Sequence, residues 1–303
     1  MPLTKEPLDR GALGREITIL ANAGVDQLDS RAASRPPIAQ ARRIGITGAP
    51  GAGKSTLVGH LAMHRSQGRR YGILAIDPTS PKSGGAILGD RIRIDELQGS
   101  VELFIRSLGS RSALDGLTDN LPEILDAMDC HQFDEVILET VGVGQAEYAV
   151  RALVDTVVLV LQPDTGDAIQ AMKAGIMEMA DVFVVNKADL PGSARTASDI
   201  ARIVGLQRVA AGEWARPVVR VSAQDPQSIA ALSDVLDQHA TWLASSGRNE
   251  ENRRERARYI LKRIAERRIG RVIATLADET LDRSTDEQWA EVLNVLDAWK
   301  HRG

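Results

Sequence analysis

The sequence is poor in the residues that mark secreted, disulfide-bonded or membrane proteins. Its 303 residues include one cysteine, Cys130, which excludes an internal disulfide framework and fits a reducing compartment. No apolar run approaches the roughly 20 residues that a membrane-spanning helix requires. The opening stretch MPLTKEPLDRGALGREITIL carries charges throughout and lacks the apolar centre of a signal peptide. We therefore expect a cytoplasmic protein that does not engage a membrane.

The sequence also lacks clustered metal ligands and an excess of positive charge. Of its five scattered histidines, only His60 and His64 could share a helix face. Zinc sites usually need three or four ligands, so an ordinary helix surface is the better interpretation. A formal net charge of −4 gives no reason to expect nucleic acid as the main partner.

Short runs rich in β-branched residues alternate with helical patterns over residues 42–245. Several runs are apolar almost throughout, as expected for strands that are covered on both faces. The alternation predicts an α/β fold with a doubly wound, mostly parallel sheet. The expected strands are 43–47, 71–77, 101–106, 135–139, 156–162, 182–186 and 217–223.

Two helical extensions flank this central domain of residues 42–245. Residues 1–41 contain a weakly helical stretch at 13–34 and then the linker-like SRPPIAQ. Residues 246–303 follow a break at SSGRNEEN and contain an arginine-rich helical segment, where interspersed glutamates favour a solvated face over a nucleic-acid surface.

The end of the C-terminal extension is an amphipathic helical pattern. Ser284 to Glu287 offers capping residues ahead of the apolar periodicity. Such a stripe must be buried on its own domain or on another chain, and we expect a dimer or partner contact. The stripe consists of Trp289, Val292, Leu293, Leu296 and Trp299.

A phosphate-binding loop stands between an expected strand and an expected helix. The residues GAPGAGKST satisfy the full G-x-x-x-x-G-K-[ST] pattern. Glycines let successive N–H groups converge on phosphate oxygens at a helix N-terminus, where the dipole favours an anion. Lys54 supplies positive charge, and the Ser55 hydroxyl is expected to bind Mg²⁺. The expected nucleotide-binding residues here are Gly48, Ala49, Pro50, Gly51, Ala52, Gly53, Lys54, Ser55 and Thr56.

A second motif, Asn186-Lys187-Ala188-Asp189, ends a later strand and bears on the base. The Asp189 carboxylate can accept two hydrogen bonds from N1 and the exocyclic amine of guanine, a pair that adenine does not offer. A further strand ends in Ser222-Ala223, where a backbone N–H could reach the guanine oxygen. An N-K-x-D alone is often only a turn, but downstream of a phosphate loop it favours GTP over ATP.

Residues between the two motifs are candidates for binding magnesium and sensing the γ-phosphate. Glu139 ends a strand, where a carboxylate could associate with Mg²⁺ or orient the attacking water. The Gly142 N–H could contact the γ-phosphate and move when that phosphate leaves. Asp77 and Asp90 are candidate magnesium ligands, although carboxylates in such loops are also ordinary turn residues. Gln145 could orient the attacking water or be merely structural.

The chemistry predicted by these residues is Mg²⁺-dependent hydrolysis of GTP to GDP and phosphate, in which Lys54 and the metal offset the developing charge. No arginine finger is evident, so we expect slow hydrolysis that a partner accelerates.

The order of these motifs resembles the MeaB/MMAA family (long labelled ArgK), the GTPase chaperones of adenosylcobalamin-dependent acyl-CoA mutases. The resemblance covers roughly residues 42–224 and is carried by GAPGAGKST, AIDPTSPKSGGAILGDRIRI, ELFIRS, ETVGVGQAE, PDTGDAIQAMKAGIMEMADVFVVNKAD and VSA. It implies a G domain with helical extensions and a homodimer formed through the C-terminal arm. It also implies GTP hydrolysis that gates adenosylcobalamin loading and protects the mutase.

The resemblance assigns roles residue by residue. The family's phosphate, metal-side acidic and base-reading positions are matched by Lys54, Ser55, Asp77, Asp90, Glu139, Asn186, Lys187 and Asp189. A further mobile segment, which relays the nucleotide state to the mutase in this family, is matched by Asp167, Gln170 and Lys173.

Some positions depart from the family pattern. Ser112 and Asp115 stand where family members typically have glycines, and Ala174 replaces the second lysine of a usual pair. These changes fall in segments expected to touch the mutase. They suggest a divergent subgroup that serves an isobutyryl- or 2-hydroxyisobutyryl-CoA mutase rather than the methylmalonyl enzyme.

Three other functions share the nucleotide chemistry. A metal-insertion GTPase would need cysteine and histidine ligands. A kinase of a small molecule or transport protein would need an acceptor pocket and a base. A nucleotide-dependent scaffold would show no useful turnover.

Overall fold

The computed structural model describes residues 5–24, 27–28, 40–78, 102–110, 120–140, 145–163, 175–206, 209–210 and 212–300. The chain divides into two compact units, one of residues 1–21 with 38–252 and one of residues 22–37 with 253–303. The domain boundaries expected after residues 41 and 245 stay predictions. Among the described helices, none combines the length and the apolar character needed to cross a membrane.

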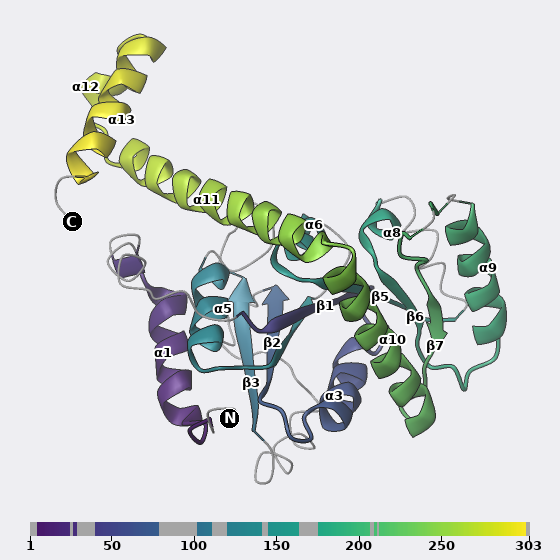
Figure 1. Cartoon of the computed structure of the whole chain (residues 1–303). Helices are drawn as coiled ribbons and strands as arrows, with labels where there is room; N and C mark the ends of the chain where they lie inside the picture. Colours follow the sequence, from purple (N-terminus) through teal and green to yellow (C-terminus); the bar gives the residue numbers. More distant parts are fainter. Residues whose placement is uncertain are drawn as a thin grey trace. The chain divides into compact units, whose positions relative to one another are not determined.

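The first unit is built on a seven-stranded sheet in which the described strands pair only in parallel (Figure 1). The strand order β3-β2-β4-β1-β5-β6-β7 places β1 at the centre, with later strands added on both sides. The predicted doubly wound α/β fold is confirmed. The strands are β1 (Arg42–Gly48), β2 (Tyr71–Pro78), β3 (Leu103–Ser110), β4 (Glu135–Thr140), β5 (Thr156–Leu161), β6 (Val182–Val185) and β7 (Val218–Arg220).

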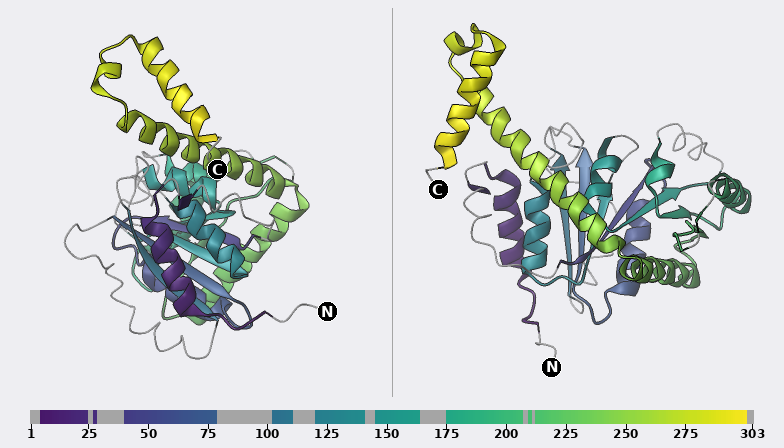
Figure 2. Two further views of the ribbon diagram at one scale, coloured as in Figure 1. Left: turned by 90° about the vertical axis from the view of Figure 1, so that its left-hand side faces the viewer. Right: turned by 45° about the horizontal axis from the view of Figure 1, so that its top comes forward.

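Helices cover both faces of this sheet, as the two views of Figure 2 show. On one face, Ile44 and Ile46 of β1 share a core with the helices that follow β1 and β7. On the other face, a Cβ added to Gly45 would lie 2.5 Å from the side chain of Val150 in α6 (Gln145–Leu153), so glycine at this position lets α6 approach the sheet closely. The helices of this unit are α1 (Arg10–Asn22), α3 (Lys54–Arg65), α5 (Leu121–Cys130), α6 (Gln145–Leu153), α8 (Ile176–Met179), α9 (Ser193–Gly205) and α10 (Pro226–Ser245).

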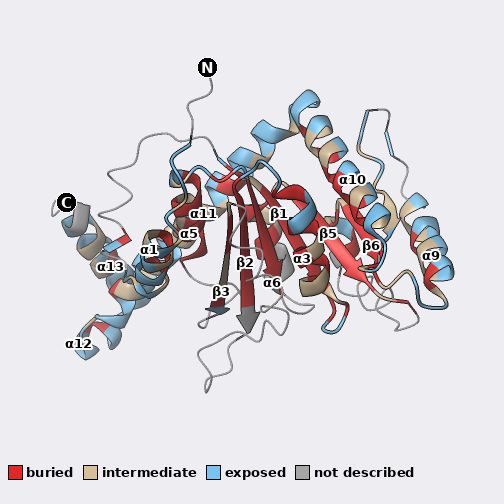
Figure 3. Cartoon of the chain, turned by 90° about the horizontal axis from the view of Figure 1, so that it is seen from below, coloured by how far each residue is buried: buried red, intermediate tan, exposed pale blue. Residues whose placement is uncertain are grey.

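The central strands are buried along their whole length, which explains their continuous apolar runs (Figure 3). Every residue of β4, β5 and β6 is buried. Because parallel strands end at a common edge, the loops after β1, β4, β5 and β6 emerge on the same side of the sheet.

The N-terminal helix α1 packs as part of the first unit. Its first turn is capped by Asp9, whose Oδ1 accepts a hydrogen bond of 2.8 Å from the Ala12 N–H, so the helix begins earlier than the predicted residue 13. The Arg10 Nε donates to the Leu103 carbonyl at 2.9 Å. At the other end, the Asn120 side chain donates to the Leu20 carbonyl at 2.7 Å.

The second unit contains α11 (Arg248–Ala274) from Arg253 onwards, then α12 (Asp278–Leu281) and α13 (Thr285–Lys300). The expected cap of the last helix is confirmed as a capping box: the Ser284 N–H donates to Glu287 Oε2 at 3.1 Å, and the Glu287 N–H donates to Ser284 Oγ at 3.4 Å. Val292 is buried, whereas Trp289 and Leu293 remain about half exposed, at 48% and 49%. The homodimer stays a prediction.

A buried histidine lies where α10 packs against the sheet. His239 is fully buried, its Nδ1 is 2.8 Å from Thr156 Oγ1, and its ring stacks on Trp242 with centroids 5.5 Å apart. Burial lowers the pKa of His239 to about 4, although the nearby Asp181 carboxylate acts in the opposite direction. The imidazole is therefore neutral in the folded protein at pH 7.

This burial predicts a loss of stability in mild acid. The His239 pKa is about 4 when folded and about 6.5 when unfolded, so the unfolded chain binds the proton more readily. The stabilisation linked to the neutral His239 is complete above pH ~6.5. The free energy of unfolding then falls by about 3 kcal/mol as the pH drops towards 4. Urea unfolding of the wild type and His239→Gln across this range measures it.

The matched control is His64→Gln, since His64 is exposed on α3. We expect this variant to keep the wild-type pH dependence and His239→Gln to lose that part of the slope. Identical slopes for the wild type and His239→Gln would contradict the interpretation.

Candidate nucleotide-binding site

The phosphate loop connects the central strand β1 to α3 and relies on glycine at two tight positions. Gly48 has φ +147°, and a Cβ there would lie 2.1 Å from the Val160 carbonyl oxygen. Gly53 has φ +81°, and a Cβ there would lie 2.5 Å from the Asn186 side-chain nitrogen. Any side chain at either position would displace the Val160 backbone or the Asn186 side chain.

Side chains bind the carbonyl oxygens of this loop. The Lys54 ammonium is buried and donates to the Gly48 and Ala49 carbonyls at 2.8 and 3.0 Å. The Asn186 side chain donates to the Ala52 carbonyl at 2.8 Å. These contacts hold the loop at the N-terminus of α3, where backbone N–H groups and the helix dipole favour an anion.

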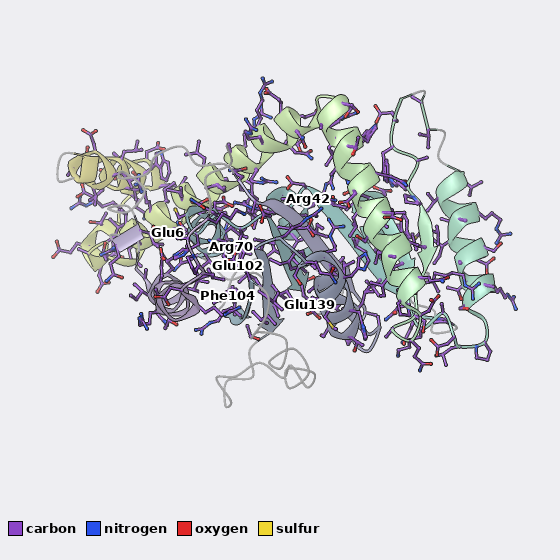
Figure 4. All side chains as sticks on the ribbon, turned by 60° about the horizontal axis from the view of Figure 1, so that its bottom comes forward. Glu6, Arg42, Arg70, Glu102, Phe104 and Glu139 are labelled. Atoms are coloured by element: carbon purple, nitrogen blue, oxygen red, sulfur yellow. The ribbon has the colours of Figure 1, made fainter. Side chains whose placement is uncertain are left out.

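The Ser55 hydroxyl and the Glu139 carboxylate come together at the start of α3. Ser55 Oγ donates to Glu139 Oε1 at 2.5 Å, and Glu139 is only 3% exposed at the end of β4. In the register of the sheet Glu139 of β4 lies opposite Ile46 of β1. This pair is four residues further along both strands than the Arg42–Glu135 pair; Arg42 and Glu139 are labelled in Figure 4. Two hard oxygen donors at the phosphate loop fit Mg²⁺, whose other ligands are usually phosphates and water.

The remaining candidate metal ligands are only partly described. Asp77 lies near the end of β2, two residues past Ala75, which pairs with Glu139, so its backbone reaches the same edge of the sheet. Asp90 lies outside the described residues. Within the described ranges no three His, Cys, Asp or Glu residues gather into a metal site, so the fit to Mg²⁺ rests on Ser55 and Glu139.

This pair predicts a strong dependence of turnover on Glu139. The variant Glu139→Gln keeps the side-chain volume but removes the charge that would attract the metal. We expect GTP hydrolysis at limiting Mg²⁺ to fall about 10²-fold, with partial recovery at high Mg²⁺. Phosphate release titrated with Mg²⁺ measures it.

A matched control is Glu178→Gln, which removes an exposed carboxylate of α8. It should leave the Mg²⁺ dependence unchanged. A Glu139→Gln protein with wild-type turnover at every Mg²⁺ concentration would remove Glu139 from the metal site.

The NKAD motif follows β6 and contacts the phosphate loop directly. Lys187 has φ +53°, and its ammonium donates to the Gly51 carbonyl and to Gln162 Oε1, each at 3.0 Å. Asn186 is buried and reaches Ala52, as described above. The motif therefore fixes the phosphate loop from beneath. Gln162, directly after β5, was not anticipated, because no local pattern distinguishes it from any polar residue at a strand end.

Asp189 ends the motif with an exposed carboxylate that is held in direction. The Ser222 hydroxyl, just after β7, donates to Asp189 Oδ1 at 2.6 Å. This hydrogen bond and the Lys187 charge lower the pKa of Asp189, so the carboxylate stays ionised at neutral pH. An ionised, oriented acceptor next to a phosphate loop suits the N1 and amine donors of guanine.

The structure thus brings together most of the described candidates in one connected group at the carboxyl edge of the sheet, while Ala223 adjoins Ser222 in the chain. Gln145 begins α6, but its side chain is not described. Several predicted residues lie outside the described residues: Asp90, Ser112, Asp115, Gly142, Asp167, Gln170, Lys173 and Ala174.

Comparison with known proteins points to one family. The family described as methylmalonyl-CoA mutase-associated GTPase MeaB matches residues 13–277. A Pyrococcus abyssi protein, whose name gives a provisional GTPase assignment, is 39% identical over 286 residues, which cover 92% of this chain and 86% of that protein. The mouse protein named methylmalonic aciduria type A homolog, mitochondrial, is 36% identical over 209 residues, 68% of this chain and 50% of that protein.

Solved structures share the fold at low sequence identity. A crystal structure titled LAO/AO transport system kinase has a TM-score of 0.61 and 22% identity, covering 96% of this chain and 100% of that chain. HypB from Helicobacter pylori, solved in complex with nickel, has a TM-score of 0.50 and 16% identity, covering 72% of this chain and 94% of that chain. Both likenesses concern the fold alone.

Proposed function

The chain belongs to the family of methylmalonyl-CoA mutase-associated GTPases, and we propose that it hydrolyses GTP to gate adenosylcobalamin loading and to protect an acyl-CoA mutase. The observation that carries the guanine part is the Asp189 carboxylate, held by Ser222 and joined through Asn186 and Lys187 to the phosphate loop. This arrangement links the recognition of the base to the position of the phosphates.

The proposed mechanism is in-line attack of water on the γ-phosphate. Lys54 brings an ammonium to the floor of the loop, where it offsets negative charge on the phosphates. Ser55 and Glu139 would hold Mg²⁺, which when bound supplies electrostatic stabilisation of the phosphate oxygens. Gln145 remains the candidate for orienting the water. Asp189 orients the base.

We further propose that turnover is slow in the isolated protein and that the segment with Asp167, Gln170 and Lys173 relays the nucleotide state to the mutase. A homodimer through the C-terminal helices, a cytoplasmic location and the absence of a nucleic-acid partner are part of the same proposal. The mutase served is a methylmalonyl-, isobutyryl- or 2-hydroxyisobutyryl-CoA mutase. The family name supports the first, and the departures at Ser112, Asp115 and Ala174 favour the other two.

Incubation with γ-labelled GTP separates this function from its rivals. Release of free phosphate supports a GTPase, whereas transfer of the label to an acceptor supports a kinase of a small molecule or transport protein. If the label is neither released nor transferred, the protein is better explained as a nucleotide-dependent scaffold. Nickel or cobalt binding that changes with the nucleotide would support a metal-insertion GTPase.

The partner is tested by pull-down of the three candidate mutases with GDP and with a non-hydrolysable GTP analogue. We expect one mutase to be retained, and more strongly with one nucleotide than with the other. Equal failure with all three would remove the chaperone function and leave the GTPase function intact.

A further inference from the structure

Ala188, the residue between Lys187 and Asp189, is hydrogen-bonded through both its N–H and its carbonyl. Its partners lie at the edge of the first unit where α9 packs on β7 (Figure 1). The Ala188 N–H donates to the Val221 carbonyl at 3.0 Å. The Ala188 carbonyl accepts from Ser193 Oγ at 2.8 Å and from Arg220 Nη2 at 3.1 Å. The loop that carries the base-reading carboxylate is thus hydrogen-bonded at the residue just before it.

Ser193 and Arg220 also bind one another. Arg220 Nη2 donates to Ser193 Oγ at 2.8 Å, so the hydroxyl accepts one hydrogen bond and donates one, to the Ala188 carbonyl. Ser193 is 3% exposed at the first position of α9, whereas Arg220 ends β7 and is exposed as a residue. A buried hydroxyl fixed in this way has a single direction, which makes the contact specific rather than incidental.

The loop needs such support, because its backbone is not in a favoured conformation. Lys187 has φ +53°, a region that residues with side chains seldom adopt and that persists only when the surroundings enforce it. Asp189 itself is exposed, and the Ser222 hydroxyl donates to one of its carboxylate oxygens. The Ser222 hydrogen bond orients the carboxylate directly, and the backbone position from which the Asp189 side chain extends is set by the hydrogen bonds of Ala188.

We propose that Ser193 and Arg220 are positioning residues that set the preference for guanine by fixing the Ala188 peptide and thereby aiming Asp189. This inference rests on the proposed GTPase function and deepens it. Neither residue belongs to the G-x-x-x-x-G-K-[ST] or N-K-x-D pattern. Arg220 acts through hydrogen-bond geometry, since the pKa of Asp189 is lowered by the Ser222 hydrogen bond, then by a backbone hydrogen bond at Asp189 and by the charge of Lys187.

The test compares GDP with IDP, whose hypoxanthine base lacks the exocyclic amine and so makes one hydrogen bond fewer to Asp189. Affinities are measured calorimetrically on the full chain for the wild type, Ser193→Ala and Arg220→Gln. We expect both variants to bind GDP about tenfold more weakly and IDP only about twofold more weakly. In GTP hydrolysis KM should rise while kcat changes less than about twofold.

Two further variants distinguish positioning from general stability. Arg220→Lys keeps a donor for the same acceptors and should recover part of the lost GDP preference. Arg202→Gln removes an exposed arginine of α9, whose ion pair with Asp199 spans 3.4 Å, and should behave as wild type. Melting temperatures without nucleotide show whether the variants are folded.

The outcomes separate this inference from the function beneath it. A reduced ratio of GDP to IDP affinity in both variants supports the positioning role. Equal weakening of the two nucleotides, or no change, overturns it and leaves the GTPase function standing. Failure of the wild type to bind GDP overturns the proposed function, and the inference falls with it.

Discussion

Replacing Lys54 by alanine is expected to lower the kcat of GTP hydrolysis by about 10²–10³-fold and to weaken nucleotide binding. Lys54 is only 5% exposed and its ammonium binds the carbonyls of the phosphate loop, where low solvent exposure strengthens its electric field. Single-turnover phosphate release under saturating GTP measures the effect on chemistry.

Two controls keep this result interpretable. Lys54 also binds the Gly48 and Ala49 carbonyls, so the variant's melting temperature without nucleotide reports any loss of loop structure. Lys262→Ala removes an exposed lysine of α11 and should leave turnover unchanged. If Lys54→Ala hydrolyses GTP at more than about a tenth of the wild-type rate, Lys54 does not carry the charge stabilisation assigned to it.

Replacing Asp189 by asparagine is expected to change the preferred base of the nucleotide from guanine to xanthine. The asparagine amide offers a donor where the carboxylate accepted, so the guanine amine meets a donor and loses its partner. The xanthine carbonyl at the same ring position gains one instead. We expect kcat/KM for GTP to fall about 10³-fold and that for XTP to rise above it. Hydrolysis rates with both nucleotides measure the change.

The matched control is Asp199→Asn, an exposed acidic residue of α9 that pairs only with Arg202 in the described contacts. It should keep the wild-type preference for GTP. Ser222→Ala should weaken GTP binding less than Asp189→Asn does, because it removes one hydrogen bond to the carboxylate but not the carboxylate itself. An Asp189→Asn protein that still prefers GTP to XTP would contradict the assignment of this residue to the base.

Much of the fold could be predicted because the buried strands are visible in the sequence as short apolar runs. The runs around Ile137, Val158 and Val184 are buried on both faces and so contain almost only apolar residues. The limits of elements were less predictable. The expected strand 217–223 is shortened to Val218–Arg220, because the chain turns away at Ser222 towards the N-cap at Asp225.

The break expected at SSGRNEEN likewise proved shorter than its polar composition suggests. Gly247, at φ +75°, makes the turn between α10 and α11, and the next helix already begins at Arg248. The turn between the two helices therefore needs only one glycine in the left-handed region, rather than the whole polar stretch.

The site was predictable where chemistry follows a local pattern or a common sheet edge. Ser55 and Glu139 are 84 residues apart, yet the parallel topology predicts their meeting, and their side chains are 2.5 Å apart. Gln162, Ser193 and Arg220 could not be found in this way. Their hydrogen bonds depend on the register of β5, β6 and β7 and on the first turn of α9, and sequence patterns do not specify either.

The most direct test of the central claim is the rate of phosphate release from GTP, measured with and without an adenosylcobalamin-dependent acyl-CoA mutase. We predict slow hydrolysis by the protein alone, a clear acceleration when the mutase it serves is added, and no comparable turnover of ATP. Fast hydrolysis by the isolated protein, or a rate that none of the three candidate mutases changes, would contradict a GTPase whose switch is read by a mutase.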